Sequence, residues 1–189
     1  MKRLRLLVPK QDHPLGWIAS QRVAGNQAAL LARLADRDNV DVVAYISSLR
    51  VIRIEFDEEL PDSGMIFWDG KTDQWVIVIR SGESSARQRF SILHEFKHIV
   101  DRGSESRLYD PRYLQGHVQA EMAADHFAAS AVMPAAKVRT AIKEGHQTLR
   151  SVAEYFDVSR DRTALRLSDL RLFTVISNVN PNPERRELK

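Results

Sequence analysis

The chain has 189 residues, of which 43% are hydrophobic and 28% charged, a composition typical of one globular domain with a sizeable core. It has no cysteine, which excludes a disulfide framework, a thiolate metal site and a cysteine nucleophile. The net charge of +3 is too small to indicate nucleic-acid binding by itself, and the longest apolar stretches are too short to span a membrane. We therefore expect a cytoplasmic protein without membrane contact.

Residues 1–38 are predicted to form an N-terminal helical extension. Apolar residues recur at helical spacing from Leu15 to Ala35, although Gly25-Asn26 interrupts the pattern and can split the helix. The apolar core of residues 1–9 is too short for an export signal.

A short helix and three strands are predicted next. The helix covers Val42 to Leu49, and the strands cover Val51 to Phe56, Met65 to Trp68 and Trp75 to Ile79. The last two strands form a hairpin around residues 69–73. This order predicts an α+β fold, with a small antiparallel or mixed sheet packed on helices.

The segment His94-Glu95-Phe96-Lys97-His98 is the most informative part of the chain. On a helix, His94 and His98 fall on one face and can both direct a ring nitrogen at one metal ion. Glu95 can reach a metal-bound water without being a ligand itself. This geometry is typical of a zinc hydrolase. The alternative is a helix whose two histidines only pair with acidic side chains.

The residues around this motif support a helix. Ser85 and Gln88 have the spacing of a capping box, and Gly103 is placed to end the helix. Phe96 and Ile99 lie on the face opposite the two histidines, so the back of the helix is expected to be buried.

Zinc requires a third protein ligand. A histidine six residues after His98 would indicate a metzincin, but Ser104 occupies that position. Glu121 can complete a site of two histidines and one glutamate, and Asp125, one turn later, can accept the free ring N–H of a ligand histidine. Asp101 and His117 are the alternatives for the third ligand.

A helical C-terminal portion follows. Pro134 and Gly145 bracket one helix, and residues 147–176 contain two short helices joined by a tight turn, which resemble a helix-turn-helix. Acidic residues interrupt the positive charge of this pair, so we expect a structural role, with DNA binding as the alternative. The tail at residues 177–189 is expected to be flexible.

Three blocks of the sequence carry a family resemblance. They are Arg89 to His98, Glu121 to Ala129, and Val132-Met133-Pro134. In this order they resemble the ImmA/IrrE-type metallopeptidases, and the likeness extends from residue 39 to about residue 172. Lys97 departs from the family pattern, because small residues are common at its position.

The resemblance implies a zincin-like fold and a zinc-dependent endopeptidase of the gluzincin type. His94, His98 and Glu121 would bind Zn²⁺ and Glu95 would be the general base. The implied core covers residues 39–146, and residues 147–176 belong to the same domain. The implied substrate is a co-encoded helix-turn-helix repressor or antitoxin. The alternative function is a non-catalytic regulator that binds a partner protein or DNA.

Two further expectations concern substrate binding. By the same resemblance, Trp75 to Ile79 is expected to be an edge strand that pairs with an extended substrate, the alternative being a core strand without an exposed edge. His117, Tyr109 and Tyr113 are candidates for stabilising the oxyanion. The sequence does not indicate whether the protein is a monomer or an oligomer.

Overall fold

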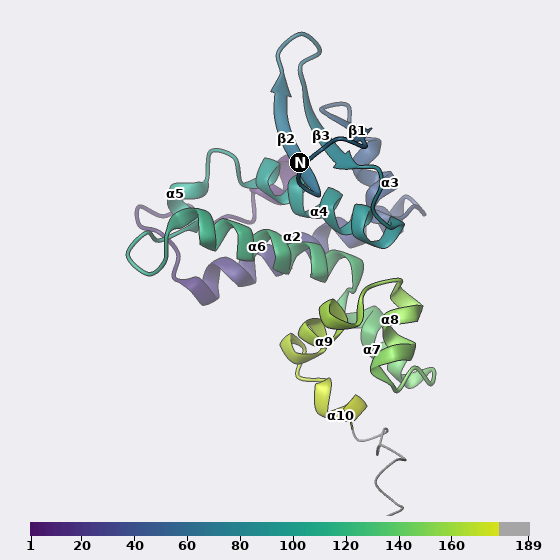
Figure 1. The fold of residues 1–189 in the computed structure, drawn as a ribbon. Coiled ribbons are helices and arrows are strands. Elements are labelled where there is room, and N and C mark those ends of the chain that lie inside the picture. The colour runs from purple at the N-terminus through teal and green to yellow at the C-terminus, as the bar shows by residue number, and fades with distance from the viewer. Residues whose placement is uncertain (178–189) are drawn as a thin grey trace, which may run out of the picture. The chain divides into compact units, whose positions relative to one another are not determined.

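The computed structural model describes residues 1–177 and divides the chain into two compact units. The first unit is Met1–Val132, and the second begins at Met133. Figure 1 shows the helices and strands of each unit. The histidine motif and Glu121 both lie in the first unit.

Six helices and three strands form the first unit. The helices are α1 (Lys2–Arg5), α2 (Trp17–Arg37), α3 (Val42–Ser47), α4 (Ser85–Asp101), α5 (Glu105–Leu108) and α6 (Gly116–Val132). The strands are β1 (Ile52–Asp57), β2 (Gly64–Asp69) and β3 (Gln74–Arg80). Across residues 1–177, no helix combines the length and the apolar content that crossing a bilayer requires.

The sheet is mixed, and its central strand is β3 (Figure 1). Strand β1 pairs with β3 in parallel and aligns Ile52 with Trp75, whereas β2 pairs with β3 antiparallel and aligns Met65 with Val78. The α+β fold with a small mixed sheet is thus as predicted. The expectation that residues 75–79 form an exposed edge is wrong. This segment is a continuous apolar run, as is typical of a strand that is covered on both sides.

The two faces of β3 belong to different apolar clusters. Ile77 and Ile79 are fully buried in the main core together with Phe96 of α4. On the other face, Val76 packs in a smaller cluster with Leu60. Burial of one such side chain contributes roughly 1.5–3 kcal/mol to the free energy of unfolding, so packing on the inner face of the sheet stabilises the position of α4.

Helix α2 is continuous, and the expected interruption at Gly25-Asn26 does not occur. A Cβ atom at Gly25 would lie 3.3 Å from Nε2 of His126 on α6. The glycine therefore permits a close approach of two helices instead of ending one. Ala124 and Ala128 of α6 are also fully buried, as expected for closely packed helices. This packing holds the helix that carries Glu121.

The described part of the second unit contains four helices. They are α7 (Ala135–Lys143), α8 (Leu149–Phe156), α9 (Arg160–Asp169) and α10 (Phe173–Ser177). Thr148 forms a capping box at the start of α8, and Asp157 turns the chain after it with a φ of 50°. Helices α8 and α9 correspond to the predicted helical pair. Beyond Ser177, the tail predicted to be flexible lies outside the described residues.

Candidate metal centre

Helix α4, which carries the histidine motif, is fixed at both ends. Ser84 caps its N-terminus by accepting a hydrogen bond from a backbone N–H of the first turn at 3.3 Å, one residue before the predicted cap at Ser85. At the other end Gly103 has a φ of 80°, which fits its predicted role in ending the helix. The guanidinium of Arg5 donates to two carbonyls of the last turn at 3.2 and 2.8 Å. These contacts satisfy groups that a helix end leaves unpaired.

His94 and His98 lie on one face of α4. Their Nε2 atoms are 3.2 Å apart, and their ring centroids are 4.9 Å apart. The side chains are 18% and 22% exposed, so they are largely buried but still reachable. Phe96 and Ile99, on the opposite face, are fully buried. The helix therefore directs both imidazoles away from the core and toward a common point.

Glu121 of α6 faces this histidine pair. Its Oε2 lies 3.1 Å from Nε2 of His94, and its Oε1 lies 3.3 Å from Nε2 of His98. Ligand atoms of the three residues lie within 4.8 Å of one another. Zinc bonds to nitrogen and oxygen are about 2.0–2.2 Å long, so two ligand atoms of a tetrahedral site are about 3.3 Å apart. The spacing of these side chains fits a zinc ion.

Asp125, one turn after Glu121, approaches the other ring nitrogen of His94. Its Oδ1 lies 3.0 Å from Nδ1 of His94. Burial by itself lowers the pKa of His94, but this hydrogen bond and the charges of Glu95, Asp125 and Glu121 outweigh burial and raise the pKa. For His98, burial and the neighbouring His94 lower the pKa. Zinc must displace a proton from any charged imidazole, so metal binding competes with protonation of the histidine pair.

The Glu95 side chain lies against the start of β2. A Cβ atom at Gly64 would be 3.0 Å from Cγ and 3.1 Å from Oε1 of Glu95, so any larger residue would push this side chain by a few tenths of an ångström. Burial raises the pKa of Glu95; His94 lowers it, while the charges of Glu121 and Asp62 add to the rise. A partly desolvated carboxylate with a raised pKa is suited to accept a proton from water.

The other candidates for the third ligand are placed elsewhere. Among the described residues, neither Asp101 nor His117 joins the group of possible metal ligands. Asp101 is buried, and its Oδ2 accepts hydrogen bonds from Nζ of Lys97 and the hydroxyl of Tyr109. His117 and Tyr113 are exposed, near the start of α6. The Tyr109 hydroxyl is thus engaged with Asp101, which does not fit a role at the oxyanion.

Two features near the site were not expected from the sequence. Lys97 and Asp101 form a buried ion pair, with 0% and 3% of each residue exposed. Burial lowers the pKa of Lys97, and Asp101 offsets part of this effect. Their spacing of four residues on one helix was a signal for the pair, but not for its burial. The second feature is the close contact of Gly64 with the Glu95 side chain.

Comparisons with known proteins give the family and a similar fold. Residues 48–168, more than half of the chain, match the model of the peptidase M78 family, described as the IrrE N-terminal-like domain. A solved structure of a Mycobacterium tuberculosis transcriptional regulator has a similar fold, with a TM-score of 0.52 and 15% sequence identity. The alignment covers 88% of this chain and 51% of that one, so this chain spans about half the length of that regulator. No curated protein matches the sequence significantly.

Proposed function

Because the chain belongs to the IrrE N-terminal-like domain family of M78 peptidases, we propose that it is a zinc-dependent endopeptidase that cleaves a protein substrate. One observation carries this proposal. The ligand atoms of His94, His98 and Glu121 lie within 4.8 Å of one another, with separations that fit a tetrahedral zinc ion. Glu95 follows the first of these ligands directly in the sequence, as a general base of such a site does.

Each side chain has a distinct role in this reaction. A zinc ion held by His94, His98 and Glu121 would supply Lewis acidity, which lowers the pKa of a bound water to about 7 and polarises the scissile carbonyl. Glu95 accepts the proton of the attacking water and passes it to the leaving amine. Asp125 accepts a hydrogen bond from the Nδ1–H of His94. The proton thus stays on Nδ1, and Nε2 is available as a ligand.

Strand β2 is the edge along which we expect an extended substrate to bind. Strand β3 is paired on both sides, whereas β2 lies at the end of the sheet. Gly64, at the start of β2, lies against Glu95. A peptide that forms main-chain hydrogen bonds with β2 would therefore pass beside the general base. This proposal replaces β3 with β2 as the strand that binds the substrate.

The proposed substrate is a co-encoded helix-turn-helix repressor or antitoxin. The sequence resemblance to ImmA/IrrE-type peptidases is the main support. The similar solved structure is a transcriptional regulator, which agrees with a role in the control of transcription. We infer that this reaction takes place in the cytoplasm, because the apolar core of residues 1–9 is too short for a recognisable export signal.

A cleavage assay with the purified, zinc-loaded protein tests this function. The wild type should cut the co-encoded helix-turn-helix protein into two defined fragments, and Glu95→Gln should bind zinc but cut nothing. Glu154→Gln, a change at an exposed glutamate of α8, is the matched control and should cut at the wild-type rate. The proposal fails if Glu95→Gln cleaves normally or retains the full effect of the protein in cells.

A non-catalytic regulator that binds a partner protein or DNA is the alternative. Helices α8 and α9 favour it, because two short helices joined by a tight turn resemble a helix-turn-helix. The exposed face of α9, however, mixes charges, with Arg160 beside Asp161, and carries Leu165, which is 62% exposed. Such a face suits a protein partner better than a phosphate backbone. The intact Glu95 favours catalysis.

A further inference from the structure

We propose that a buried clasp between α4 and α6 positions Glu121 for metal binding, an inference that rests on the proposed zinc site. The clasp consists of Asp101, Tyr109, Asp110 and Gln119. None of the four belongs to the group of possible metal ligands among the described residues. The clasp residues would therefore act through Glu121, as positioning residues.

The first half of the clasp joins the segment between α4 and α6, residues 102–115, to the end of α4. The hydroxyl of Tyr109, directly after α5, donates a hydrogen bond to Oδ2 of Asp101, and Nζ of Lys97 donates one to the same oxygen. Asp101 lies three residues after the ligand His98. Tyr109 and Asp101 are 5% and 3% exposed. Hydrogen bonds to a charged group are strong where the group is buried. This contact therefore fixes the segment between α4 and α6 against α4.

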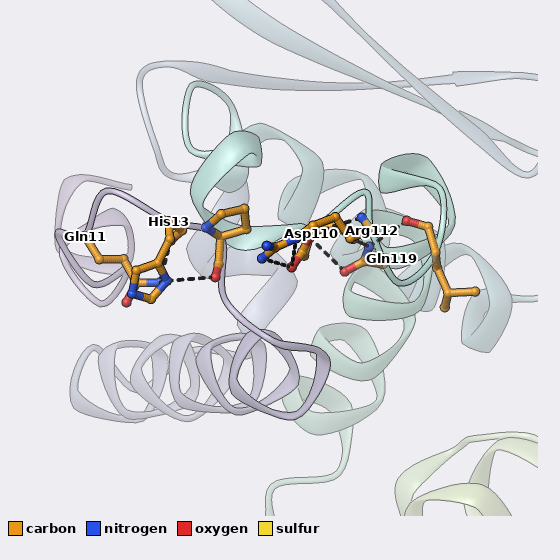
Figure 2. A network of polar contacts seen from close by, with 7 residues as sticks. Gln11, His13, Asp110, Arg112 and Gln119 are labelled. Carbon is orange, nitrogen blue, oxygen red and sulfur yellow. Dashed lines mark hydrogen bonds and ion pairs between the residues drawn. The ribbon is translucent and has the colours of Figure 1, made fainter.

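The second half of the clasp ties the next residue to α6. The backbone N–H of Asp110 donates to Oε1 of Gln119 at 3.2 Å. The Nε2 of Gln119 donates to the carbonyls of Asp110 and Leu114, at 2.5 and 2.8 Å. Figure 2 shows the Gln119 amide facing Asp110. Three hydrogen bonds determine the orientation of this buried amide, which lies two residues before Glu121.

The side chain of Asp110 holds this part of the connection in shape. Its carboxylate accepts hydrogen bonds from the backbone N–H of Arg112 at 3.0 Å, and from its Nε and Nη2 atoms at 2.9 and 2.7 Å (Figure 2). The turn so formed presents the main chain of Asp110 to Gln119. Tyr109 and Asp110, adjacent in sequence, thus link the two helices that carry the proposed ligands.

The Glu121 side chain is 59% exposed, so few neighbouring side chains hold it in place. Its position therefore depends on how its backbone is fixed. Apolar packing between the two helices includes Phe96 and Phe127, with ring centroids 6.3 Å apart. Phe127 is six residues beyond Glu121, about 9 Å along the helix axis. The clasp is closer in sequence to the ligand and joins α6 where the helix begins. Ala123, two residues after Glu121, is fully buried in the main core, so this packing and the clasp together fix the Glu121 backbone relative to the two histidines.

Zinc affinity, measured by competition with a chelator, tests the clasp. Gln119→Met removes the amide at nearly constant size and should weaken zinc binding, by at most the roughly 10–100-fold that loss of a direct hydrogen-bond partner of a ligand costs. Gln27→Met is the matched control, because Gln27 is equally buried and its amide donates to the carbonyl of Leu4, a hydrogen bond that does not involve the segment between α4 and α6. The control should keep wild-type zinc affinity.

Tyr109→Phe provides a milder second variant. It should also weaken zinc binding, and the loss in the double variant with Gln119→Met should be smaller than the product of the two single losses, because both changes open one clasp. Independent effects that multiply, or equal losses in Gln119→Met and Gln27→Met, would overturn the proposal.

Hydrogen exchange on the metal-free proteins tests, without zinc, whether the clasp orders the start of α6. Amides at residues 116–122 should exchange faster in Gln119→Met than in wild type, and Gln27→Met should leave them protected. Unchanged exchange in Gln119→Met contradicts the clasp. A wild type that takes up no zinc contradicts the proposed function instead, and the exchange comparison still shows whether the clasp orders this end of α6.

Discussion

The Oδ1 atom of Asp125 lies 3.0 Å from Nδ1 of His94, and Asp125 follows Glu121 by one helical turn. One face of α6 thus presents two carboxylates to the same imidazole, one at each ring nitrogen. The first would share the zinc with His94, and the second would orient the ring. This relationship makes α6 as important to the proposed site as the helix with the histidine motif.

Asp125→Ala should weaken zinc binding 10–100-fold without abolishing it, because His94 would keep its position as a ligand but lose the acceptor that fixes its ring. Chelator competition measures the change. Asp161→Ala, at an exposed aspartate of α9, is the control and should have no effect. Equal zinc affinities of Asp125→Ala and the wild type would exclude this role for Asp125.

Gly64→Ala should impair catalysis while zinc stays bound. The new Cβ would lie 3.1 Å from Oε1 of Glu95 and 3.2 Å from Cδ1 of Ile79, so the carboxylate must move. A displacement of about 1 Å can cost about 100-fold in rate, so we expect this smaller shift of a few tenths of an ångström to lower kcat severalfold. Gly82→Ala is the matched control, because no atom lies within 4 Å of its Cβ position. Wild-type turnover in Gly64→Ala would show that the contact does not position Glu95.

The parts of the proposed site that depend on local helical geometry can be predicted from the sequence. The spacing of His94 and His98 places them on one face of any helix, and the spacing of Glu121 and Asp125 does the same on α6. The family resemblance supported Glu121 over Asp101 and His117. The structure adds the separations of the ligand atoms, which a spacing along the chain does not contain.

Features that depend on long-range contacts were missed or wrong. The order of the strands depends on the parallel pairing of β1 with β3, and a hairpin pattern in β2 and β3 does not reveal it. The burial of Lys97 depends on the side chains that surround α4, since a lysine is rarely buried without a partner. Gly25 interrupts a helical pattern in sequence, but in the fold it makes room for His126.

Zinc should stabilise the folded protein. A ligand that binds only the native state at 100 times its Kd contributes about 2.7 kcal/mol, so the midpoint of thermal unfolding should rise when zinc is added. His98→Ala should lose this rise, and His117→Ala should keep it, because His117 lies outside the group of possible ligands. Differential scanning calorimetry measures both. An equal rise in the two variants would place the zinc elsewhere.

The contribution of Asp110 to stability should depend on pH. The side-chain and backbone hydrogen bonds from Arg112 lower the pKa of Asp110 below its unfolded value. The charged form therefore stabilises the fold above a pH of about 4, and this contribution is lost as the pH falls through the lowered pKa. Asp110→Asn should lower the midpoint of thermal unfolding at neutral pH, and its difference from wild type should narrow below a pH of about 4. A constant difference across this range would contradict the assignment.

The zinc content of the purified protein tests the central claim most directly. Metal analysis after dialysis should find one zinc per chain in the wild type and in Glu95→Gln, and almost none in His94→Ala or Glu121→Ala. A wild type without zinc, or Glu121→Ala with a full zinc complement, would contradict a site shared by α4 and α6.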